Sequence, residues 1–381
     1  MIPGDIGAEI ARVLQAMVTA GELPPRAASL PAAGTWRPAP AGAGGGPGTY
    51  ATSLPLALGR LAGVAAEPVA GQLAAGLAAV PWISAARVTG RGYLTVTVTV
   101  ARLAALPARI AAPGQAVAAS GALAGTRLTA PGLADPATAP DWARAWRTQR
   151  DALAGRLADA AGADVLFFDA QRELTPESPA QARAGAAPVT PPGPFGPPVA
   201  RAGGGPVAAA VVRHGSDAVR YALARTSAPR VGAITGQLGL PLDLANPFVM
   251  VRYAHADAAS TRRWAADLGL APDRPEGQPD RGPDLMRPEL ILADKLSWLP
   301  ERVAAAARRR RPADFVAYLE NLADAWLDCA GCCPALPFRG RGAPAVLAGE
   351  QTAARLELSD AARIVLAAGL TSLGISAPAR M

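Results

Sequence analysis

The stretch NPFVMVRYAHADAASTRRW, Asn246 to Trp264, combines a histidine, a tyrosine, a tryptophan and three arginines in one run. Its periodicity predicts a helix over 247–268. Three interpretations are open: a core helix with solvated arginines, a catalytic histidine site, or a surface that reads a ligand. At helical spacing one face holds Tyr253, Asp257, Ser260 and Trp264, and a neighbouring face holds Val251, His255, Ala258 and Arg262.

The chain on both sides of this helix is also helical in pattern. Apolar periodicity predicts further helices over 217–226, 288–309, 312–329 and 351–374, joined by polar, proline-containing loops. Short connections between amphipathic helices are typical of bundles. We therefore predict a helix bundle over 206–381.

The N-terminal part, residues 1–113, has a mixed pattern that predicts a small α+β domain. Its strongest strand signal is WISAARVTGRGYLTVTVTV, where Gly90 and Gly92 mark the bend of a hairpin. Residues 114–205 form a degenerate, linker-like middle region that holds one clear helix, leaves room for a strand, and ends in a Pro/Gly-rich segment. The predicted fold class is mainly α: a C-terminal helical bundle and an N-terminal α+β domain, joined by this segment.

The composition favours a polyanionic partner. The formal net charge is +7, and Lys295 is the only lysine beside a large arginine pool. A GC-rich codon composition also favours arginine, so this excess is weak support for nucleic acid by itself. The first residues lack a basic export signal, no apolar run is dense enough to span a membrane, and the cysteines form no disulfide framework. We expect a cytoplasmic protein without a membrane partner.

The sequence offers no catalytic constellation. Its two histidines, His214 and His255, lie in different segments, and neither a GxSxG elbow nor a P-loop is present. Beside His214, Ser216 and Asp217 are best interpreted as ordinary helix capping. We predict no catalytic residues, no metal and no cofactor.

Two clusters keep alternatives open. Cys329, Cys332 and Cys333 could hold a metal or act in redox chemistry, but small buried side chains at a helix end are favoured. The run from Arg308 to Arg311 could bind phosphates, or it could complement a helix C-terminus that ends before Pro312.

Several motifs resemble the arginyl-tRNA synthetases. The end GISAPARM resembles their closing Gly-(Ile/Val)-Ser-Ala-Pro-x-Arg-Met signature, and NPFVMVRYAHADAAS resembles their Asn-Pro … Tyr-Ala-His-Ala-Arg helix. SDAVRYALAR resembles the sequence that names the DALR anticodon-binding domain, and TYATSLPLALGRLAG and VTGRGYLTVTVT resemble their N-terminal additional domain. The resemblance is collinear over roughly 1–113 and 213–381, and it implies a DALR-type helical domain.

The family's catalytic motifs are missing from this resemblance. Class I synthetases use a His-x-Gly-His turn and a Lys-Met-Ser-Lys-Ser loop to stabilise charge on ATP phosphates. Neither occurs here, and about 90 residues of helix and linker stand where the catalytic domain would lie. We infer that aminoacylation is lost and that the chain resembles stand-alone anticodon-binding relatives of the NrtL type.

By motif position, the resemblance implies RNA-binding roles for Arg252, Tyr253, His255, Arg262, Arg380 and Met381. The family's arginine after Tyr-Ala-His-Ala is replaced by Asp257, which removes a possible phosphate donor. The tyrosine and histidine could instead hold the bundle together.

Three functions follow as hypotheses. The first is a non-catalytic protein that binds tRNA or another structured RNA. The second is a protein-interaction or regulatory module with a partner in translation. The third, an enzyme that uses the middle segment, lacks a nucleophile–base pair. The RNA, the partner and the oligomeric state stay open.

Overall fold

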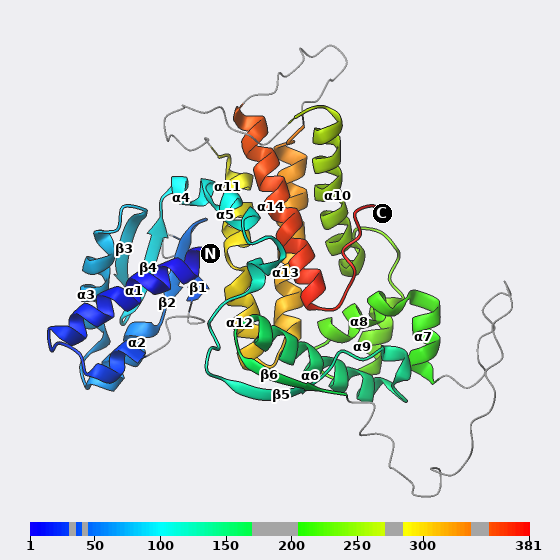
Figure 1. Ribbon diagram of the computed structural model, residues 1–381, viewed down its shortest axis with the longest axis horizontal. Coiled ribbons are helices and arrows are strands. Elements are labelled where there is room, and N and C mark those ends of the chain that lie inside the picture. Colours follow the sequence, from blue (N-terminus) through cyan, green and yellow to red (C-terminus); the bar gives the residue numbers. More distant parts are fainter. Residues whose placement is uncertain (30–35, 40–44, 170–204, 271–284, 337–349) are drawn as a thin grey trace, which may run out of the picture.

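The computed structural model describes residues 1–29, 36–39, 45–169, 205–270, 285–336 and 350–381. Figure 1 shows a mixed α+β unit on one side and a bundle of long helices in the centre, with shorter helices below it. The predicted fold class, mainly α with a small N-terminal sheet, is confirmed.

The N-terminal unit is built on a four-stranded antiparallel sheet of order β1-β2-β4-β3. Helices α2 and α3 pack on the sheet, and α1 packs on α3. Its elements are α1 (Ile2–Thr19), a 3-10 turn (Pro25–Ser29), β1 (Trp36–Pro38), β2 (Thr49–Thr52), α2 (Leu54–Ala62), α3 (Ala66–Ala78), β3 (Ile83–Thr89), β4 (Tyr93–Val98), α4 (Val100–Ala104) and α5 (Leu106–Ala111).

The hairpin predicted around Gly90 and Gly92 is confirmed. Strands β3 and β4 pair antiparallel up to the Thr89–Tyr93 pair. Both glycines have positive φ, 56° and 100°, a region that L side chains rarely adopt. A Cβ on Gly92 would also lie 2.7 Å from the Cβ of Ala66, so the turn needs glycine for space as well as conformation.

Residues 114–169 of the middle region are folded. The predicted helix is α6 (Trp142–Ala160), and it packs against α12 and α8 of the bundle. The chain before and after it forms β5 (Arg127–Pro131) and β6 (Asp164–Phe168), which pair in parallel, so α6 is the crossover between them. The linker prediction is therefore confined to residues 170–204, which lie outside the described residues.

The helices predicted for the C-terminal bundle over 217–226, 247–268, 312–329 and 351–374 are confirmed, whereas the helices over 206–214 and 231–238 were not predicted. Its long helices α10, α13 and α14 pack on one another, and α11 joins α13 and α14. None of the helices in the described ranges is long and apolar enough to span a membrane. The elements are α7 (Pro206–His214), α8 (Ser216–Arg225), α9 (Val231–Leu238), α10 (Pro247–Asp267), α11 (Arg287–Ser297), α12 (Leu299–Arg309), α13 (Pro312–Cys332) and α14 (Glu350–Ser372).

The single helix predicted over 288–309 is wrong, because the structure divides it into α11 and α12 at Trp298. Pro300 has no amide hydrogen, so the helical bond to the carbonyl of Leu296 cannot form there. The apolar periodicity continues through the break, and this continuity is why the sequence pattern did not reveal it.

The N-terminal unit docks on this break. Gly48 donates its N–H to Asp294 at 3.0 Å, and the Tyr50 hydroxyl lies 2.9 Å from the hydroxyl of Ser297. The ring of Tyr50 packs against Trp298 with centroids 5.1 Å apart. Because Tyr50 and Ser297 are fully buried, this contact joins sheet and bundle through a continuous core.

Candidate nucleic-acid interface

Helix α10 begins at a defined cap. The side chain of Asn246 accepts a hydrogen bond from the N–H of Phe248 at 3.1 Å and donates to the carbonyl of Pro241. Pro247 occupies the first helical position, where its missing N–H costs nothing. The cap therefore fixes both the start of α10 and the rotation at which its side chains meet the rest of the molecule.

The last residues, 373–381, fold back from the end of α14 and run beside α10 (Figure 1). We call them the C-terminal tail. The turn is made by Gly374 with φ 68°, and a Cβ there would overlap the side chain of Leu133. Ile375 is then buried in the main core. The tail is thus held in one place from its first turn.

The SDAVRY motif of α8 also holds the tail. Asp217 accepts hydrogen bonds from both the backbone N–H and the hydroxyl of Ser376. Arg220 donates to the carbonyl of Gly374 at 3.0 Å. The predicted capping by Ser216 and Asp217 is wrong, since α8 begins after Gly215 without a side-chain cap. The sequence does not reveal this role because the partner lies 159 residues further along the chain.

From α10, His255 and Arg263 hold the far part of the tail. His255 is 4% exposed, and its Nδ1 lies 2.9 Å from the carbonyl oxygen of Pro378, so Nδ1 carries the proton and donates. Burial lowers the pKa of His255 and outweighs this hydrogen bond, which leaves the ring neutral near pH 7. Arg263 donates to the carbonyl of Ala379 at 2.7 Å.

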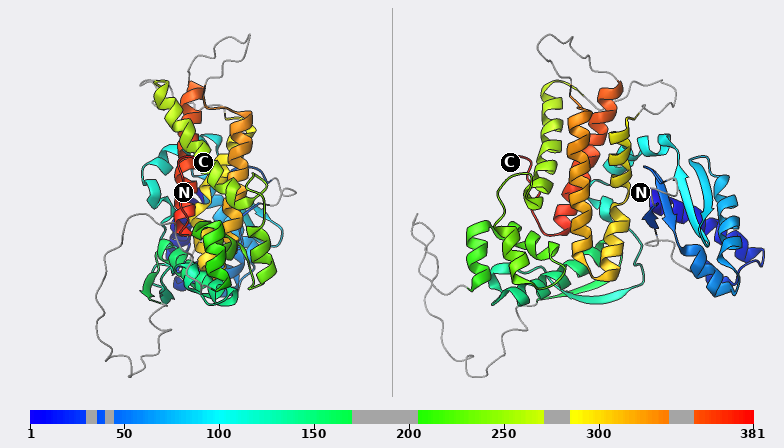
Figure 2. Two further views of the ribbon diagram at one scale, coloured as in Figure 1. Left: turned by 90° about the vertical axis from the view of Figure 1, so that its right-hand side faces the viewer. Right: turned by 180° about the vertical axis from the view of Figure 1, so that it is seen from behind.

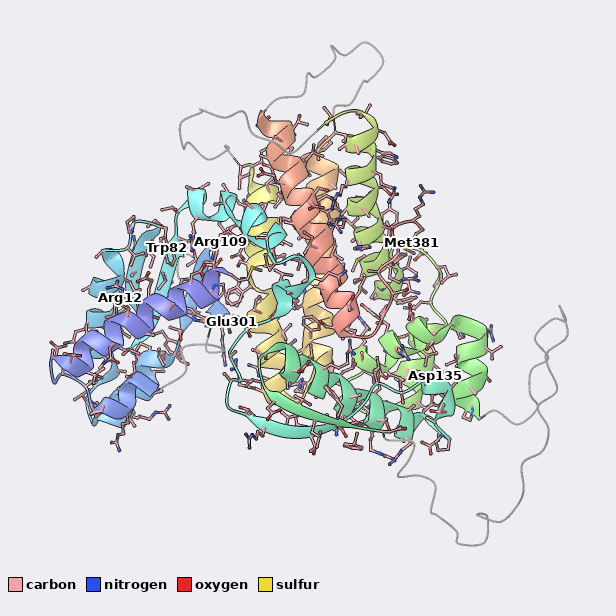
Figure 3. All side chains as sticks on the ribbon, in the orientation of Figure 1. Arg12, Trp82, Arg109, Asp135, Glu301 and Met381 are labelled. Atoms are coloured by element: carbon pink, nitrogen blue, oxygen red, sulfur yellow. The ribbon has the colours of Figure 1, made fainter. Side chains whose placement is uncertain are left out.

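Several aromatic and cationic side chains of α10 and of the tail stay open to solvent. Tyr253 is 38% exposed and Trp264 is 56% exposed, on one shared face of α10. Met381 is 61% exposed and lies on the α10 side of the bundle (Figure 3). Arg380 is exposed at the end of the tail. We call the surface formed by these side chains of α10 and the tail the α10–tail face. It consists of Arg252, Tyr253, Arg262, Trp264, Arg380 and Met381.

Two predicted arginines are partly engaged within the protein. The guanidinium of Arg252 lies over the ring of Phe248 at 5.1 Å and 3.4 Å from the hydroxyl of Ser376. Arg262 pairs with Asp360 of α14 at 3.0 Å, but its side chain is 62% exposed. Each guanidinium has five N–H donors, so both keep donors for a ligand.

Asp257, on the same face of α10 as Tyr253 and Trp264, contacts helix α13. Its carboxylate accepts a hydrogen bond from the Trp326 indole N–H of α13 at 3.1 Å. Burial raises the pKa of Asp257, and the hydrogen bond from Trp326 opposes the rise. The residue at the position of the family's arginine therefore takes part in the contact between α10 and α13.

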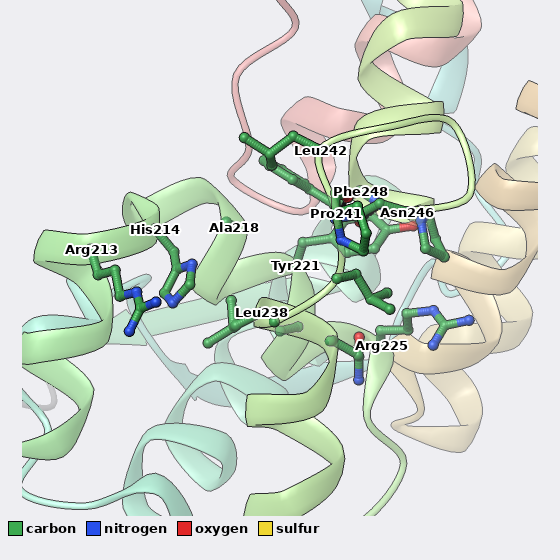
Figure 4. Close-up of a pocket in the computed structure, with 15 residues that line it drawn as sticks. Arg213, His214, Ala218, Tyr221, Arg225, Leu238, Pro241, Leu242, Asn246 and Phe248 are labelled. Atoms are coloured by element: carbon green, nitrogen blue, oxygen red, sulfur yellow. Dashed lines mark hydrogen bonds between the residues drawn. The ribbon is translucent and has the colours of Figure 1, made fainter.

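A pocket of about 370 Å³ lies between α7, α8 and the chain that enters α10 (Figure 4). Figure 4 shows Arg213 and His214 on one side of it and Leu242 and Phe248 on the other. Arg225, also in its wall, pairs with Glu320 at 2.6 Å. The pocket mixes apolar walls with cationic side chains, and it adjoins the start of α10.

The cysteine cluster lies at the end of α13, as predicted. Cys329 and Cys333 are buried and Cys332 is exposed. Burial raises the pKa of Cys329 to about 12, which keeps it a thiol at neutral pH. Across the described ranges no group of three or more His, Cys, Asp and Glu side chains is placed to hold a metal ion.

Residues 251–381 match the family model described as the DALR anticodon binding domain, so the match begins within α10 and includes the tail. The arginine–tRNA ligase of Frankia alni is 38% identical over 175 residues. Over these parts the chain is similar to the arginyl-tRNA synthetases. The aligned region covers 44% of the present chain and 29% of the length of the Frankia alni ligase.

A solved structure shares the fold. The arginyl-tRNA synthetase of Thermus thermophilus superposes with a TM-score of 0.60 at 14% identity, with 100% of each chain covered. At that identity the likeness concerns the fold alone. The sequence analysis did not predict three residues that hold the tail: Asp217, Arg220 and Arg263. All three are charged side chains that bond to backbone or hydroxyl groups of the tail, and only the folded chain brings these groups together.

Replacing Asp217 with alanine is expected to release the C-terminal tail of the present chain. Hydrogen bonds to a charged group contribute about 1.5–3 kcal/mol each, and the variant loses two. Amide hydrogen exchange measures this directly, because the N–H of Ser376 is one of the donors. We expect faster exchange over 375–381 and unchanged exchange in α13; unchanged protection of Ser376 would contradict the assignment.

Proposed function

We propose that this chain is a non-catalytic, cytoplasmic RNA-binding protein that binds tRNA or another structured RNA through the α10–tail face. The observation that carries the proposal is the anchoring of the tail by Asp217, Arg220, His255 and Arg263. These contacts use backbone and hydroxyl groups of the tail, and Arg380 and Met381 stay exposed, as does Tyr253 of α10.

The chemistry of the face suits unpaired bases. Loop bases are read by stacking on aromatic or guanidinium planes and by hydrogen bonds to their edges. Tyr253 and Trp264 are 11 residues apart on one face of α10, which corresponds to about 16 Å along the helix axis. Two rings at this spacing could stack on separate bases of one loop. Arg252, Arg262 and Arg380 would neutralise phosphates where the RNA strand passes around α10, since Arg262 lies nine residues and about 180° around the helix from Tyr253.

His255 has a different role in the proposal from the one its motif position implies. At 4% exposure its ring is covered by the tail and is unavailable for stacking. We assign it as a positioning residue that holds the Pro378 carbonyl, and through it Arg380 and Met381, beside α10. RNA contact through His255 itself would require the tail to lift.

The non-catalytic part of the proposal rests on residue types. Adenylation by class I synthetases needs cationic donors on the ATP phosphates from paired histidines and from a lysine-rich loop. Here His214 and His255 belong to α7 and α10, and Lys295 lies within α11. ATP–pyrophosphate exchange with arginine should be absent, and measurable exchange would overturn this part.

A titration of labelled tRNA at several salt concentrations tests RNA binding. We expect the logarithm of the association constant to fall linearly with the logarithm of salt concentration, because neutralised phosphates release counterions. For an unpaired loop, a slope of about −2 would correspond to contacts from Arg252, Arg262 and Arg380 at about −0.7 each. Affinity for tRNA no higher than for random RNA, and lost at physiological salt, would exclude specific binding.

The second candidate is a protein-interaction module, and one observation favours it. The segment between α9 and α10 exposes Leu242 at 87% and Leu244 at 49%, next to the pocket of Figure 4. Exposed apolar side chains that lie together are a feature of protein-interaction sites. Purification from cells with a stoichiometric protein and without nucleic acid would favour this candidate over RNA binding.

A further inference from the structure

A second cationic site lies away from the α10–tail face, where α12 ends and α13 begins. A cleft of about 520 Å³ opens there, with a floor that includes Trp146 of α6 and Leu223 of α8. Three arginines from the α12–α13 junction and one from α6 line it: Arg309, Arg310, Arg311 and Arg150. We call this the arginine cleft.

Two carboxylates hold the four guanidinium groups in position. Asp151 contacts Arg150 at 2.9 Å and Arg310 at 3.3 Å. Asp314 contacts Arg309 at 3.5 Å and Arg311 at 3.4 Å. Positive groups remain in excess, and since each guanidinium has five N–H donors, most donors are not used by these pairs.

The backbone and the aromatic floor add to this arrangement. Arg310 has φ 51° and is the one non-glycine residue with positive φ in the described ranges. Helices commonly end on a glycine in this conformation, so an arginine here accepts local strain and directs its side chain toward Asp151. The guanidinium carbon of Arg150 lies over the buried Trp146 ring, 4.8 Å from its centroid, a cation–π contact.

We propose that the arginine cleft binds phosphate groups. Planar guanidinium donors match phosphate oxygens in pairs, and the first turn of α13, entered at Pro312, adds the positive end of a 21-residue helix. The rim arginines are 53–60% exposed, so a ligand reaches them from solvent. Two sources supply the same chemistry: the backbone of an RNA already bound at the α10–tail face, or a free phosphorylated molecule.

The test uses the full chain with Arg309→Gln and Arg311→Gln combined. Glutamine keeps a polar amide at each position and removes the positive charge, so the variant loses two charges. The matched control combines Arg12→Gln and Arg127→Gln, since each of these exposed arginines also pairs with one carboxylate. The first arm titrates labelled tRNA at several salt concentrations. The second arm titrates sodium pyrophosphate by calorimetry.

If RNA is the source, the cleft variant lowers the salt slope by about 1 to 2 and weakens RNAs of different sequence equally, while the control variant leaves both unchanged. This arm rests on the proposed function. If a free phosphate is the source, RNA binding is unaffected and pyrophosphate binding is lost in the cleft variant only. If the wild-type chain binds no RNA, the proposed function fails, and the pyrophosphate titration still tests whether the arginine cleft binds phosphate. Equal behaviour of the cleft and control variants in both arms overturns the phosphate site.

Discussion

Replacing Tyr253 with alanine is expected to weaken tRNA binding by about 5- to 150-fold, which corresponds to about 1–3 kcal/mol of lost stacking on one base. The ring is 38% exposed, and its hydroxyl makes no hydrogen bond within the described part of the chain. The variant should therefore fold as the wild type does, and the loss should appear in affinity. Fluorescence anisotropy of labelled tRNA gives the measurement.

Two controls separate stacking from other effects. Tyr253→Phe keeps the ring, so it should retain most of the affinity. Tyr93→Ala removes an equally large ring, 46% exposed, from the N-terminal sheet and should leave affinity unchanged. If Tyr253→Ala binds as tightly as Tyr93→Ala, α10 does not present a stacking surface to RNA. Trp264→Ala then distinguishes loss of one aromatic contact from loss of the whole face.

Replacing Glu289 with alanine is expected to lower the free energy of unfolding by about 3–5 kcal/mol, the range for breaking a buried ion pair. Glu289 is 2% exposed. One carboxylate oxygen accepts from Arg355 of α14 at 2.7 Å, and the other accepts from the N–H of Met286 at 2.6 Å. Alanine leaves a partly buried guanidinium without its charge partner and a helix-start amide without an acceptor. Urea unfolding measures the loss.

Matched variants give the scale for this effect. Glu9→Ala removes a surface partner of Arg12 and should cost about 0.5 kcal/mol or less. Glu289→Leu combined with Arg355→Met replaces the pair with apolar side chains and should recover much of the stability. A loss below about 1 kcal/mol for Glu289→Ala would mean that Arg355 finds another partner, and the pair would then not hold α11 to α14.

Local signals in the sequence predicted much of the fold. The helix at 247–268 and the hairpin around Gly90 both carry periodicities and turn residues that act over a few positions. The break at Trp298 was not predicted, because the spacing of apolar residues continues through it unchanged. The parallel pairing of β5 and β6 also escaped, because it depends on a crossover helix rather than on neighbouring residues.

The candidate site was less predictable, because its contacts join distant parts of the chain. Motif position brought His255 forward as an RNA contact, yet its burial is produced by tail residues 123 positions away. Asp217 had the local pattern of a cap, and only the folded chain reveals Ser376 as its partner. Spacing places Tyr253 and His255 on different faces of one turn of α10, but it does not reveal which of the two faces the tail covers.

The docking of β2 on α11 also sets a geometric limit on ligands. The hydrogen bonds of Gly48 and Tyr50 fix the N-terminal sheet on one flank of the bundle, while α10 and the tail lie on the opposite flank (Figures 1 and 2). The N-terminal sheet and the α10–tail face are therefore directed to opposite sides of the molecule. A compact RNA hairpin could contact one of these two surfaces only, and a ligand that touches both would have to bend around the bundle. Footprint length on an RNA would report which of these occurs.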